Sequence, residues 1–190
     1  MVAATGFTDR RVKAVAGDIT DNATLQTLLD DSVDIVIHLA AVVSSQEEEN
    51  FALGLETNLL ASLGLIERLR QLGTCTVFLT TSSVATFGSK LPDSVPDQWC
   101  NRPQSPYGTQ KAIVDLLIND YSRRGYINGR SLVMPTIVVR PGKPNKAASS
   151  FASGIIREPL AGLAAVCPVN TLTSLWIMSP TKPSVICCTA

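Results

Sequence analysis

The chain has 190 residues, of which 45% are hydrophobic and 17% are charged; this excludes a disordered or fibrous protein and fits one domain with one core. Sixteen basic residues balance sixteen acidic ones, so the charge gives no reason to expect nucleic acid or an anionic membrane as a partner. No apolar run approaches the ~20 residues that cross a bilayer, and the first residues lack a signal-peptide pattern. We therefore expect a cytoplasmic protein.

The first third of the chain alternates between predicted strands and a helix. Residues 12–16 form an apolar run typical of a strand. Residues 22–29 are predicted to be a short helix that Thr20 or Asp21 can cap. Residues 34–39 are nearly all apolar, as burial on both faces of a parallel sheet requires.

A long helix is predicted over residues 47–72, where Gly73 ends it. Residues 76–80 then form a short apolar run that indicates a buried strand. The spacing of apolar and small residues along the helix places one stripe toward the core. The stripe consists of Phe51, Leu55, Leu59, Ser62, Ile66 and Leu69.

The second half repeats the alternation. A proline-rich loop over residues 90–103 leads to a helix predicted from Tyr107 to about Arg124, followed by a strand over 132–139 that Pro135 weakens at its centre or places near an edge. The alternation predicts an α/β fold with a doubly wound parallel sheet of Rossmann type. The residues expected on the buried face of the helix are Ile113, Leu116, Leu117 and Tyr121.

Scarce residue types narrow the chemistry. His38 is the only histidine, so the chain lacks the parts of a His-based metal site and of Ser-His-Asp hydrolysis, and we expect no metal. We expect His38 to pack at the end of its strand. The five cysteines have no metal-type spacing and are expected to be reduced thiols without a role. They are Cys75, Cys100, Cys167, Cys187 and Cys188.

Residues 105–111, Ser-Pro-Tyr-Gly-Thr-Gln-Lys, place a tyrosine four residues ahead of a lysine at the start of a helix. Residues i and i+4 share one helix face, so Tyr107 and Lys111 point into the same cleft. An ammonium group favours an ionised phenol, which makes Tyr107 a plausible proton acceptor for a substrate hydroxyl. The alternative is a solvated helix start.

Hydroxyl residues follow the strand predicted over 76–80. Ser82 and Ser83 lie where an open α/β sheet forms its ligand contacts, outside the carboxyl ends of its strands. Ser83 is the better candidate for a catalytic hydroxyl. The alternative is a turn hydroxyl that binds its own backbone.

Six motifs of the chain resemble those of the extended short-chain dehydrogenase/reductase family, the NAD-dependent epimerases and dehydratases, and occur in the family's order. The family contains nucleotide-sugar epimerases, dehydratases and sugar-acid dehydrogenases. The motifs are Gly17-Asp18-Ile19-Thr20, His38-Leu39-Ala40-Ala41, Asn58, Ser82-Ser83, Tyr107 with Lys111, and Arg140-Pro141-Gly142.

The resemblance implies a role for each catalytic candidate. Tyr107 would take the substrate hydroxyl proton while hydride leaves the same carbon for NAD, or for NADP. Lys111 would hold a ribose hydroxyl and lower the pKa of the tyrosine. Ser83 would donate a hydrogen bond to the developing alkoxide.

The resemblance also implies contacts to the cofactor along several strand ends. For Asp18, a helix N-cap or an Asx turn is an equally good explanation, and for Asn58 a core hydrogen bond is the alternative and can coexist with the site role. The implied cofactor-binding residues are Asp18, Ile19, Leu39, Ala40, Ala41, Asn58, Ser82, Tyr107, Lys111, Pro141 and Gly142.

A narrower likeness lies in the run Pro-Gly-Lys-Pro-Asn-Lys at residues 141–146, which looks like the D-erythronate dehydrogenase branch of the family. It implies oxidation of a D-erythronate-like 2-hydroxy acid, with Ser83 and Tyr107 at its hydroxyl and Lys143, Asn145 and Lys146 near its carboxylate. A solvated basic loop is an equal alternative for the last three. The other functions kept open are a nucleotide-sugar epimerase or dehydratase, and a non-catalytic remnant that binds another chain through open sheet edges.

The sequence also departs from the family. It contains no G-x-x-G-x-x-G between a strand and a helix, and no acidic ribose ligand at the end of a second strand. We expect residues 1–160 to be a partial dinucleotide-binding domain that lacks its first βαβ unit. Residues 161–190 are expected to hold the start of a small substrate domain and a divergent tail. The activity would then be impaired in this fragment, and a homo-oligomer is possible.

Overall fold

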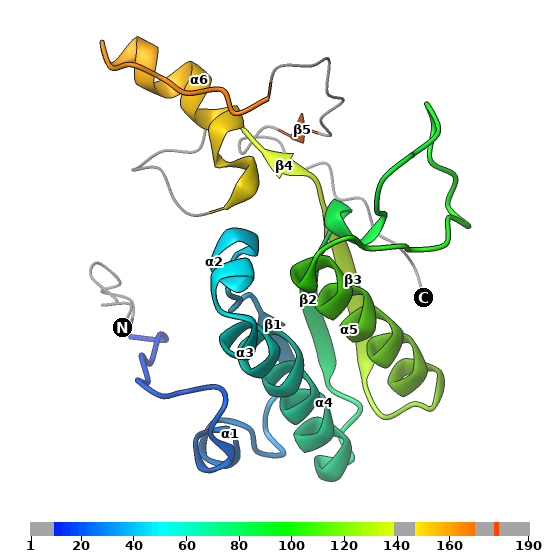
Figure 1. Ribbon diagram of the computed structural model, residues 1–190. Helices are drawn as coiled ribbons and strands as arrows, with labels where there is room; N and C mark the ends of the chain where they lie inside the picture. Colours follow the sequence, from blue (N-terminus) through cyan, green and yellow to red (C-terminus); the bar gives the residue numbers. More distant parts are fainter. Residues whose placement is uncertain (1–9, 139–146, 170–176, 179–190) are drawn as a thin grey trace.

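The computed structural model describes residues 10–138, 147–169 and 177–178. Its centre is a three-stranded parallel sheet in the order β1-β2-β3, with helices packed against it (Figure 1). The strands are β1 (Ile35–His38), β2 (Val77–Ser83) and β3 (Asn128–Met134). Strands that alternate with helices and pair in parallel confirm the α/β fold of Rossmann type.

Strand β2 is the middle strand and is longer than the predicted run over residues 76–80. Its register places Val77 beside Ile35 of β1 and Ser83 beside Met134 of β3. Ser82 and Ser83 are therefore the last two residues of the strand rather than part of a loop beyond it. Side chains alternate along a strand, and Phe78, Thr80 and Ser82 are the buried set.

Helix α1 (Asn22–Leu28) matches the predicted segment. Of the two candidate caps, Asp21 is the residue that caps it: its carboxylate accepts hydrogen bonds from the backbone N–H groups of Ala23 at 3.2 Å and Thr24 at 3.0 Å. A side-chain oxygen at this position satisfies N–H groups that have no partner within the helix. Leu25, the buried residue of α1, faces α4 at Gly64.

The helix predicted over residues 47–72 is not continuous. It begins earlier, as α2 (Ser44–Glu49), and breaks at Asn50, whose side chain accepts from the N–H of Leu53 and restarts the helix. It then runs through α3 (Phe51–Gly54), a π-helical segment (Leu55–Leu60) and α4 (Ala61–Leu72). Gly73 ends α4 in the left-handed region, with φ 71°, as predicted.

The π-helical segment changes which side chains are buried. Ser62, Ile66 and Leu69 face the core as expected, whereas Phe51 is 57% exposed and its place in the predicted stripe is wrong. A π-helical turn contains more residues than an α-helical turn, so residues before it are rotated relative to those after it. Simple 3.6-residue spacing does not hold across this segment.

Helix α5 (Pro106–Arg123) agrees closely with its predicted bounds. Ser105 caps it by accepting from the N–H of Gly108 at 3.1 Å, and Pro106 occupies the first turn. Its buried face is rotated from the predicted one: Val114 and Ile118 are buried, while Leu116 is 72% exposed. Ile113 is exposed as well, and Leu117 and Tyr121 pack on the core from its margin.

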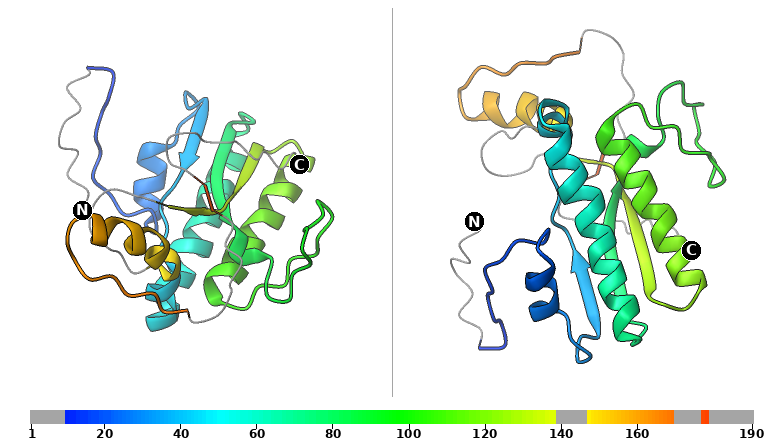
Figure 2. Two further views of the ribbon diagram at one scale, coloured as in Figure 1. Left: turned by 90° about the horizontal axis from the view of Figure 1, so that it is seen from above. Right: turned by 60° about the horizontal axis from the view of Figure 1, so that its bottom comes forward.

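The core lies between the helices and one face of the sheet. Helices α4 and α5 run side by side over β1, β2 and β3, and α1 packs on α4 at the edge (Figures 1 and 2). Burial of these side chains is the main favourable contribution to folding. The cluster consists of Leu25, Leu29, Leu65, Ile66, Leu69, Phe78, Val114, Ile118 and Ile127.

The strand predicted over residues 12–16 does not form. These residues are irregular, and Val12 and Val15 are 51% and 49% exposed. A strand needs a neighbour for its backbone N–H and C=O groups, and among the described residues none pairs with this segment. Burial of 34–39 on both faces is also wrong here, because Ile35 and Ile37 are 56% and 63% exposed.

The strand predicted over residues 132–139 begins earlier and is split at Pro135. Because proline has no N–H to donate, β3 stops at Met134 and a separate short strand, β4 (Thr136–Ile137), follows. Strand β4 pairs in parallel with β5 (Ile177–Met178). These strands and α6 (Phe151–Leu160) lie beyond the carboxyl end of the three-stranded sheet (Figure 1).

Candidate active site

Three segments meet at the carboxyl end of the sheet: the last residues of β2, the first turns of α5, and α2. They bring Ser83, Tyr107 and Lys111 together, as the sequence predicts. The contact between α5 and the turn after β2 is tight, because a Cβ atom at Gly108 would stand 2.4 Å from the carbonyl oxygen of Ala85. A glycine in the tyrosine-lysine segment therefore lets α5 close onto the end of β2.

Tyr107 is half-buried, and its phenol lies near the hydroxyl of Ser83. Burial, and next the negative charge of Glu47, raise the pKa of its phenol, while the nearby Ser83 hydroxyl opposes that rise. This differs from the expected lowering of the pKa by Lys111. The raised pKa means that the phenol is neutral at neutral pH in the protein without ligands.

Lys111 is buried, with 8% of its surface exposed. Its Nζ donates to the carbonyl oxygen of Thr81 at 2.7 Å and lies 5.8 Å from the centroid of the Tyr107 ring. Burial lowers the pKa of Lys111, and the charges of Asp115 and Glu47 act against that change. The ammonium group is thus fixed beside the tyrosine on the sheet side of α5.

The Ser83 hydroxyl fits both of the interpretations that the sequence left open. It accepts a hydrogen bond from the N–H of Ala85 at 3.1 Å, which is the behaviour of a turn hydroxyl. It also faces the Tyr107 phenol. The backbone contact fixes the oxygen at a position where it can donate toward a substrate oxygen beside Tyr107.

Beneath these residues lies a carboxylate that sequence reasoning missed. Asp115 accepts from the hydroxyl of Ser82 at 2.6 Å and from that of Ser131, so it joins β2, β3 and α5. Burial raises its pKa, and Ser131, Ser82 and Lys111 oppose that rise. The available signal was its position four residues after Lys111, on the same helix face.

Asn58, in the π-helical segment, ties the loop after β1 to the site. Its Oδ1 accepts from the N–H of Val42 at 2.8 Å, and its Nδ2 donates to the Val42 carbonyl at 3.1 Å and to Oε2 of Glu47 at 3.0 Å. The core hydrogen bond and the position next to the site therefore coincide. Sequence reasoning missed Glu47 as a site residue. In the run Glu47-Glu48-Glu49 it is the one residue that is buried.

The predicted cofactor side, at the end of β1, is open. Leu39 is 65% exposed, and Ala40 and Ala41 are exposed. Asp18 is exposed and accepts from the N–H of Thr20 at 2.9 Å and from its hydroxyl at 2.8 Å, an Asx turn that lowers the pKa of Asp18. Ile19 next to it is half-buried.

His38 ends β1 as a packing residue. It is 7% exposed, and its Nε2 lies 3.0 Å from the hydroxyl oxygen of Ser62 on α4. Burial, and next the charge of Lys111, lower the pKa of His38 to about 4. The ring is therefore neutral at physiological pH. The remaining predicted site residues, Pro141, Gly142, Lys143, Asn145 and Lys146, lie outside the described residues.

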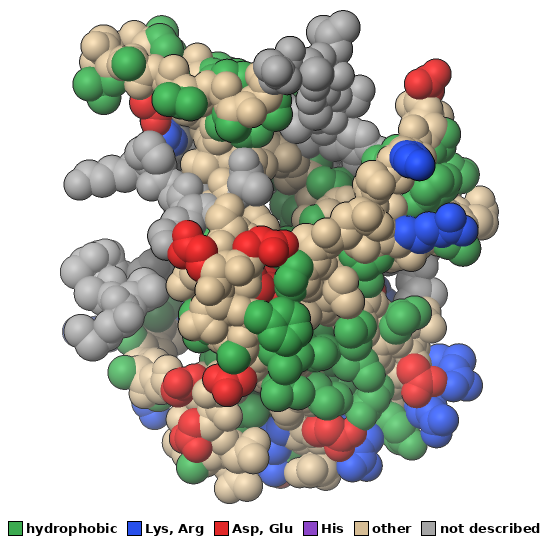
Figure 3. Space-filling model, viewed as in Figure 1, with side chains coloured by type: hydrophobic (Ala, Val, Ile, Leu, Met, Phe, Trp, Pro, Cys, Tyr) green, Lys and Arg blue, Asp and Glu red, His purple; other side chains and the backbone are tan. Residues whose placement is uncertain are grey.

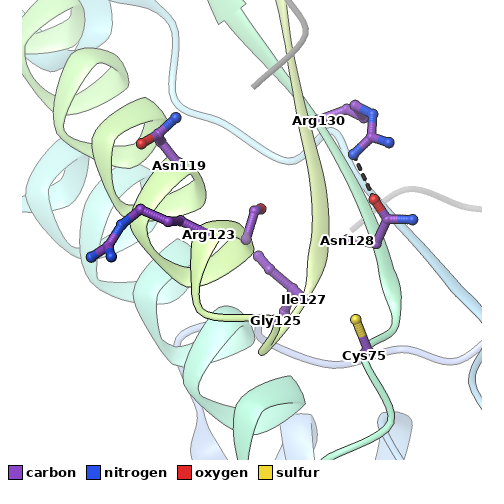
Figure 4. A pocket seen from close by; sticks show the side chains of 8 residues that line it. Cys75, Asn119, Arg123, Gly125, Ile127, Asn128 and Arg130 are labelled. Atoms are coloured by element: carbon purple, nitrogen blue, oxygen red, sulfur yellow. Dashed lines mark hydrogen bonds between the residues drawn. The ribbon is translucent and has the colours of Figure 1, made fainter.

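A hollow of about 660 Å³ lies at the other end of the sheet, where β2 and β3 begin and α5 ends (Figure 4). It shares no residue with the site above. Parallel α/β sheets bind ligands at the carboxyl ends of their strands, so we do not assign catalysis to it. Its lining residues are Cys75, Asn119, Ser122, Arg123, Gly125, Ile127, Asn128 and Arg130.

Two absences hold for the part of the chain that the structure describes. None of its helices has the length and apolar character that a membrane span needs. Nor do His, Cys, Asp and Glu side chains gather there in a group of three or more that suits a metal ion.

Comparison with known proteins gives relatives over nearly the whole chain. It is 56% identical over 180 residues to the D-erythronate dehydrogenase of Cupriavidus necator, an alignment that covers 95% of this chain and 56% of that enzyme. It is 48% identical over 172 residues to the D-erythronate dehydrogenase of Haemophilus influenzae, covering 90% of this chain and 55% of the relative. The chain thus spans about half the length of these curated relatives.

Solved structures agree with the fold. A structure described as a nucleoside-diphosphate-sugar epimerase from Agrobacterium tumefaciens is 42% identical, with a TM-score of 0.85, over 95% of this chain and 54% of that one. UDP-glucose 4-epimerase from Thermus thermophilus in complex with NAD, 24% identical with a TM-score of 0.71 over 84% of this chain and 53% of that one, shows the same fold. The profile of the NAD dependent epimerase/dehydratase family matches residues 3–176, and the chain belongs to that family.

Proposed function

We propose that this chain carries the catalytic centre of an NAD-dependent dehydrogenase that oxidises a D-erythronate-like sugar acid. The observation that carries the proposal is the meeting of Ser83, Tyr107 and Lys111 at the carboxyl end of β2. Relatives named D-erythronate dehydrogenase, up to 56% identical, support the substrate class. The proposal concerns the complete enzyme, of which this chain matches about half.

The proposed chemistry begins at the substrate hydroxyl. Tyr107 takes its proton as general base, and Lys111 holds a positive charge beside the ring to stabilise the phenolate. Ser83 donates a hydrogen bond to the substrate oxygen and fixes the orientation of its carbon. NAD, when bound, supplies the acceptor for the hydride that leaves that carbon.

The described residues fit the nicotinamide end of the cofactor. Lys111 can reach a ribose hydroxyl from the first turns of α5, and the exposed residues 39–41 leave the end of β1 open to a dinucleotide. The hydroxyl of Ser82 donates to Asp115, so Ser82 would act on the cofactor site by positioning that carboxylate. The glycine-rich turn and the acidic residue that would hold pyrophosphate and distinguish NAD from NADP are absent from these 190 residues.

The remaining assignments follow from the same proposal. Asp18, Ile19 and Asn58, with Pro141 and Gly142, would border the cofactor. Lys143 and Asn145 would meet the substrate carboxylate. Helix α6 ends at Leu160, which suits a boundary between the dinucleotide-binding part and the substrate domain.

A homo-oligomer is proposed on a separate observation. Figure 3 shows apolar side chains gathered over α3, α4 and α5. Phe51, Leu60, Ile113 and Leu116 of these helices and of the π-helical segment between them are exposed apolar residues. A second copy of this chain would cover them.

The runner-up is a nucleotide-sugar epimerase, which the description of the Agrobacterium structure favours. The two enzymes differ in net redox chemistry: the dehydrogenase accumulates NADH, whereas the epimerase does not. A non-catalytic remnant is the third candidate, favoured by the exposed outer edge of β1.

The test is a chimera that joins this chain to the parts of the Cupriavidus enzyme that lie outside the matched region. We expect NADH formation with NAD and D-erythronate, and no reaction with UDP- or GDP-sugars. Epimerisation of a nucleotide sugar without net NADH would favour the runner-up, and a folded chimera that binds NAD but turns over neither substrate would favour the remnant.

A further inference from the structure

Asp115 lies on α5, one helical turn after Lys111, and its carboxylate faces the sheet. Its Oδ2 accepts from the hydroxyl of Ser82 on β2 at 2.6 Å, and its Oδ1 accepts from the hydroxyl of Ser131 on β3. An ionised carboxylate can only accept, so two hydroxyl donors suit it. Hydrogen bonds to a charged acceptor are stronger than those between neutral groups. This bridge of Ser82, Asp115 and Ser131 therefore joins one helix to two strands.

The bridge lies where β2 and β3 run side by side toward the site. The register of the two strands places Thr80 beside Ser131 and Ser82 beside Val133, so the two serines are diagonal neighbours. Alternate residues of a strand share a face, and Thr80 and Ser82 are each 3% exposed on the face that the helices cover. A single carboxylate from α5 can thus reach both serine hydroxyls.

A second contact joins the same helix to the same strand. Nζ of Lys111 donates to the carbonyl oxygen of Thr81 at 2.7 Å, and Thr81 directly precedes Ser82. Two successive turns of α5 are therefore bonded to two successive residues of β2. A lysine side chain has many rotamers, and holding it in one of them costs entropy. The bridge fixes the separation of helix and strand over which this single lysine bond must reach.

We propose that Asp115 is a positioning residue: its bonds to β2 and β3 fix the turn of α5 that carries Lys111 and thereby keep the ammonium group on the Thr81 carbonyl. The consequence for turnover rests on the proposed dehydrogenase function, in which Lys111 must stand beside Tyr107. The positioning itself does not depend on that function. Asp115 acts through Lys111 and touches neither substrate nor cofactor in this assignment.

A carboxylate that only stabilised the fold would affect Lys111 no more than any other loss of stability does. The neighbouring residue offers the matched comparison. Val114 is 3% exposed and belongs to the core cluster, so Val114→Ala loosens the same turn of α5 and leaves the bridge intact. Asp120 provides a second control, because it lies on the same helix and pairs with the exposed residues Arg123 and Arg124.

The first measurement is the acetylation rate of Lys111 by acetic anhydride in the 190-residue chain, read by mass spectrometry against the exposed Lys90. We expect Asp115→Ala to raise this rate by ~10-fold or more, which corresponds to one lost hydrogen bond to a charged group. Val114→Ala should raise it by less than about 2-fold once urea brings the samples to equal free energies of unfolding, and Asp120→Ala should stay within the same limit. Equal rates for Asp115→Ala and Val114→Ala at equal stability would overturn the proposal.

A serine variant separates position from charge and covers the case in which Asp115→Ala does not fold. Ser131→Ala removes one hydroxyl of the bridge and no charge. We expect it to speed the acetylation of Lys111 by ~3-fold or more, whereas Ser94→Ala, at an exposed serine, should change the rate by less than about 1.5-fold. Added to Asp115→Ala, Ser131→Ala should have no further effect, because both remove the same bond. Equal rates for Ser131→Ala and Ser94→Ala would overturn the proposal.

The consequence for turnover is measured in the chimera with the Cupriavidus enzyme. Asp115→Ala should lower kcat by ~10-fold and change the KM for D-erythronate by less than about 2-fold, because it displaces Lys111 rather than a group at the substrate. Val114→Ala should keep both constants within about 2-fold of the parent. A normal kcat for Asp115→Ala would overturn the role in turnover. Because acetylation uses neither NAD nor substrate, an inactive chimera would overturn the dehydrogenase proposal and leave the acetylation result standing.

Discussion

The two flanks of the sheet differ in how completely they are built. On the flank formed by β2, β3 and α5, Lys111 is 8% exposed and Ser82 is 3% exposed. Asp115 joins all three elements through hydrogen bonds. On the other flank, Ile37 of β1 is 63% exposed and the segment over residues 12–16 forms no strand.

The difference separates the two tasks of the proposed enzyme. The catalytic groups come from segments close in sequence, so their contacts are complete within these residues. The adenosine side of a dinucleotide site depends on strands that would lie between β1 and residues 12–16 in the usual strand order. We call the flank of β2, β3 and α5 the closed flank, and it can be tested for catalysis. The flank of β1 and residues 12–16 is the open flank, and it can be tested for weak binding of the cofactor.

The largest expected effect is on cofactor binding. The 190-residue chain should bind NAD with a Kd in the millimolar range or weaker, because it lacks the pyrophosphate cradle and the acidic ribose contact. Several charge-assisted hydrogen bonds of about 1.5–3 kcal/mol each amount to a loss of ~10³-fold or more. Calorimetric titration with NAD measures it, and micromolar binding would contradict the comparison of the two flanks.

The second effect concerns the closed flank. In the chimera, Tyr107→Phe should lower kcat by at least ~10²-fold, the usual size for loss of a general base. Tyr126→Phe is the control, since Tyr126 is exposed and lies at the other end of the molecule from the site. Steady-state rates of NADH formation decide it: near-normal turnover of Tyr107→Phe would show that the phenol is not the base.

Much of the closed flank could be predicted from the sequence. The proline at the start of α5 and the tyrosine-lysine spacing are local signals, and α5 forms within a residue or so of its predicted bounds. The cap at Ser105 was not predicted, although it is also a local feature. Ser83 was predicted from its place after an apolar run. These signals depend on neighbours within one or two turns, which the sequence displays directly.

What the sequence could not show depends on packing between distant segments. The π-helical segment places Phe51 outside the core. The buried face of α5 differs from the predicted face, which leaves Leu116 exposed. The carboxylates Glu47 and Asp115 look like ordinary solvated helix residues until Gly54, Ser82 and Ser131 are placed beside them. Residues 12–16 have strand character, but a strand exists only where a neighbour accepts its hydrogen bonds.

The third prediction uses His38, which lies where the two flanks meet. Because its pKa is lowered to about 4 from 6.5, the unfolded chain takes up a proton that the folded protein does not. Stability is therefore present above pH 6.5 and is lost as pH falls toward 4. At pH 5 the loss is about 2 kcal/mol. His38→Gln should lack it, so urea unfolding at pH 7 and pH 5 should give a larger decrease for the parent chain than for the variant.

The smallest effect separates the flanks by stability alone. Ile37→Thr should change the free energy of unfolding by less than about 0.5–1 kcal/mol, because the side chain is mostly exposed and threonine keeps β-branching. Phe78→Ala, on the neighbouring strand but in the core with no exposure, should cost about 3–5 kcal/mol. Light scattering on the same samples adds a second readout, because an exposed apolar edge strand favours association. Ile37→Lys should reduce that association, since a charge on an edge strand opposes pairing with another copy. If Ile37→Thr instead destabilised the chain as much as Phe78→Ala does, the outer face of β1 would be buried in solution and the two flanks would be equally complete.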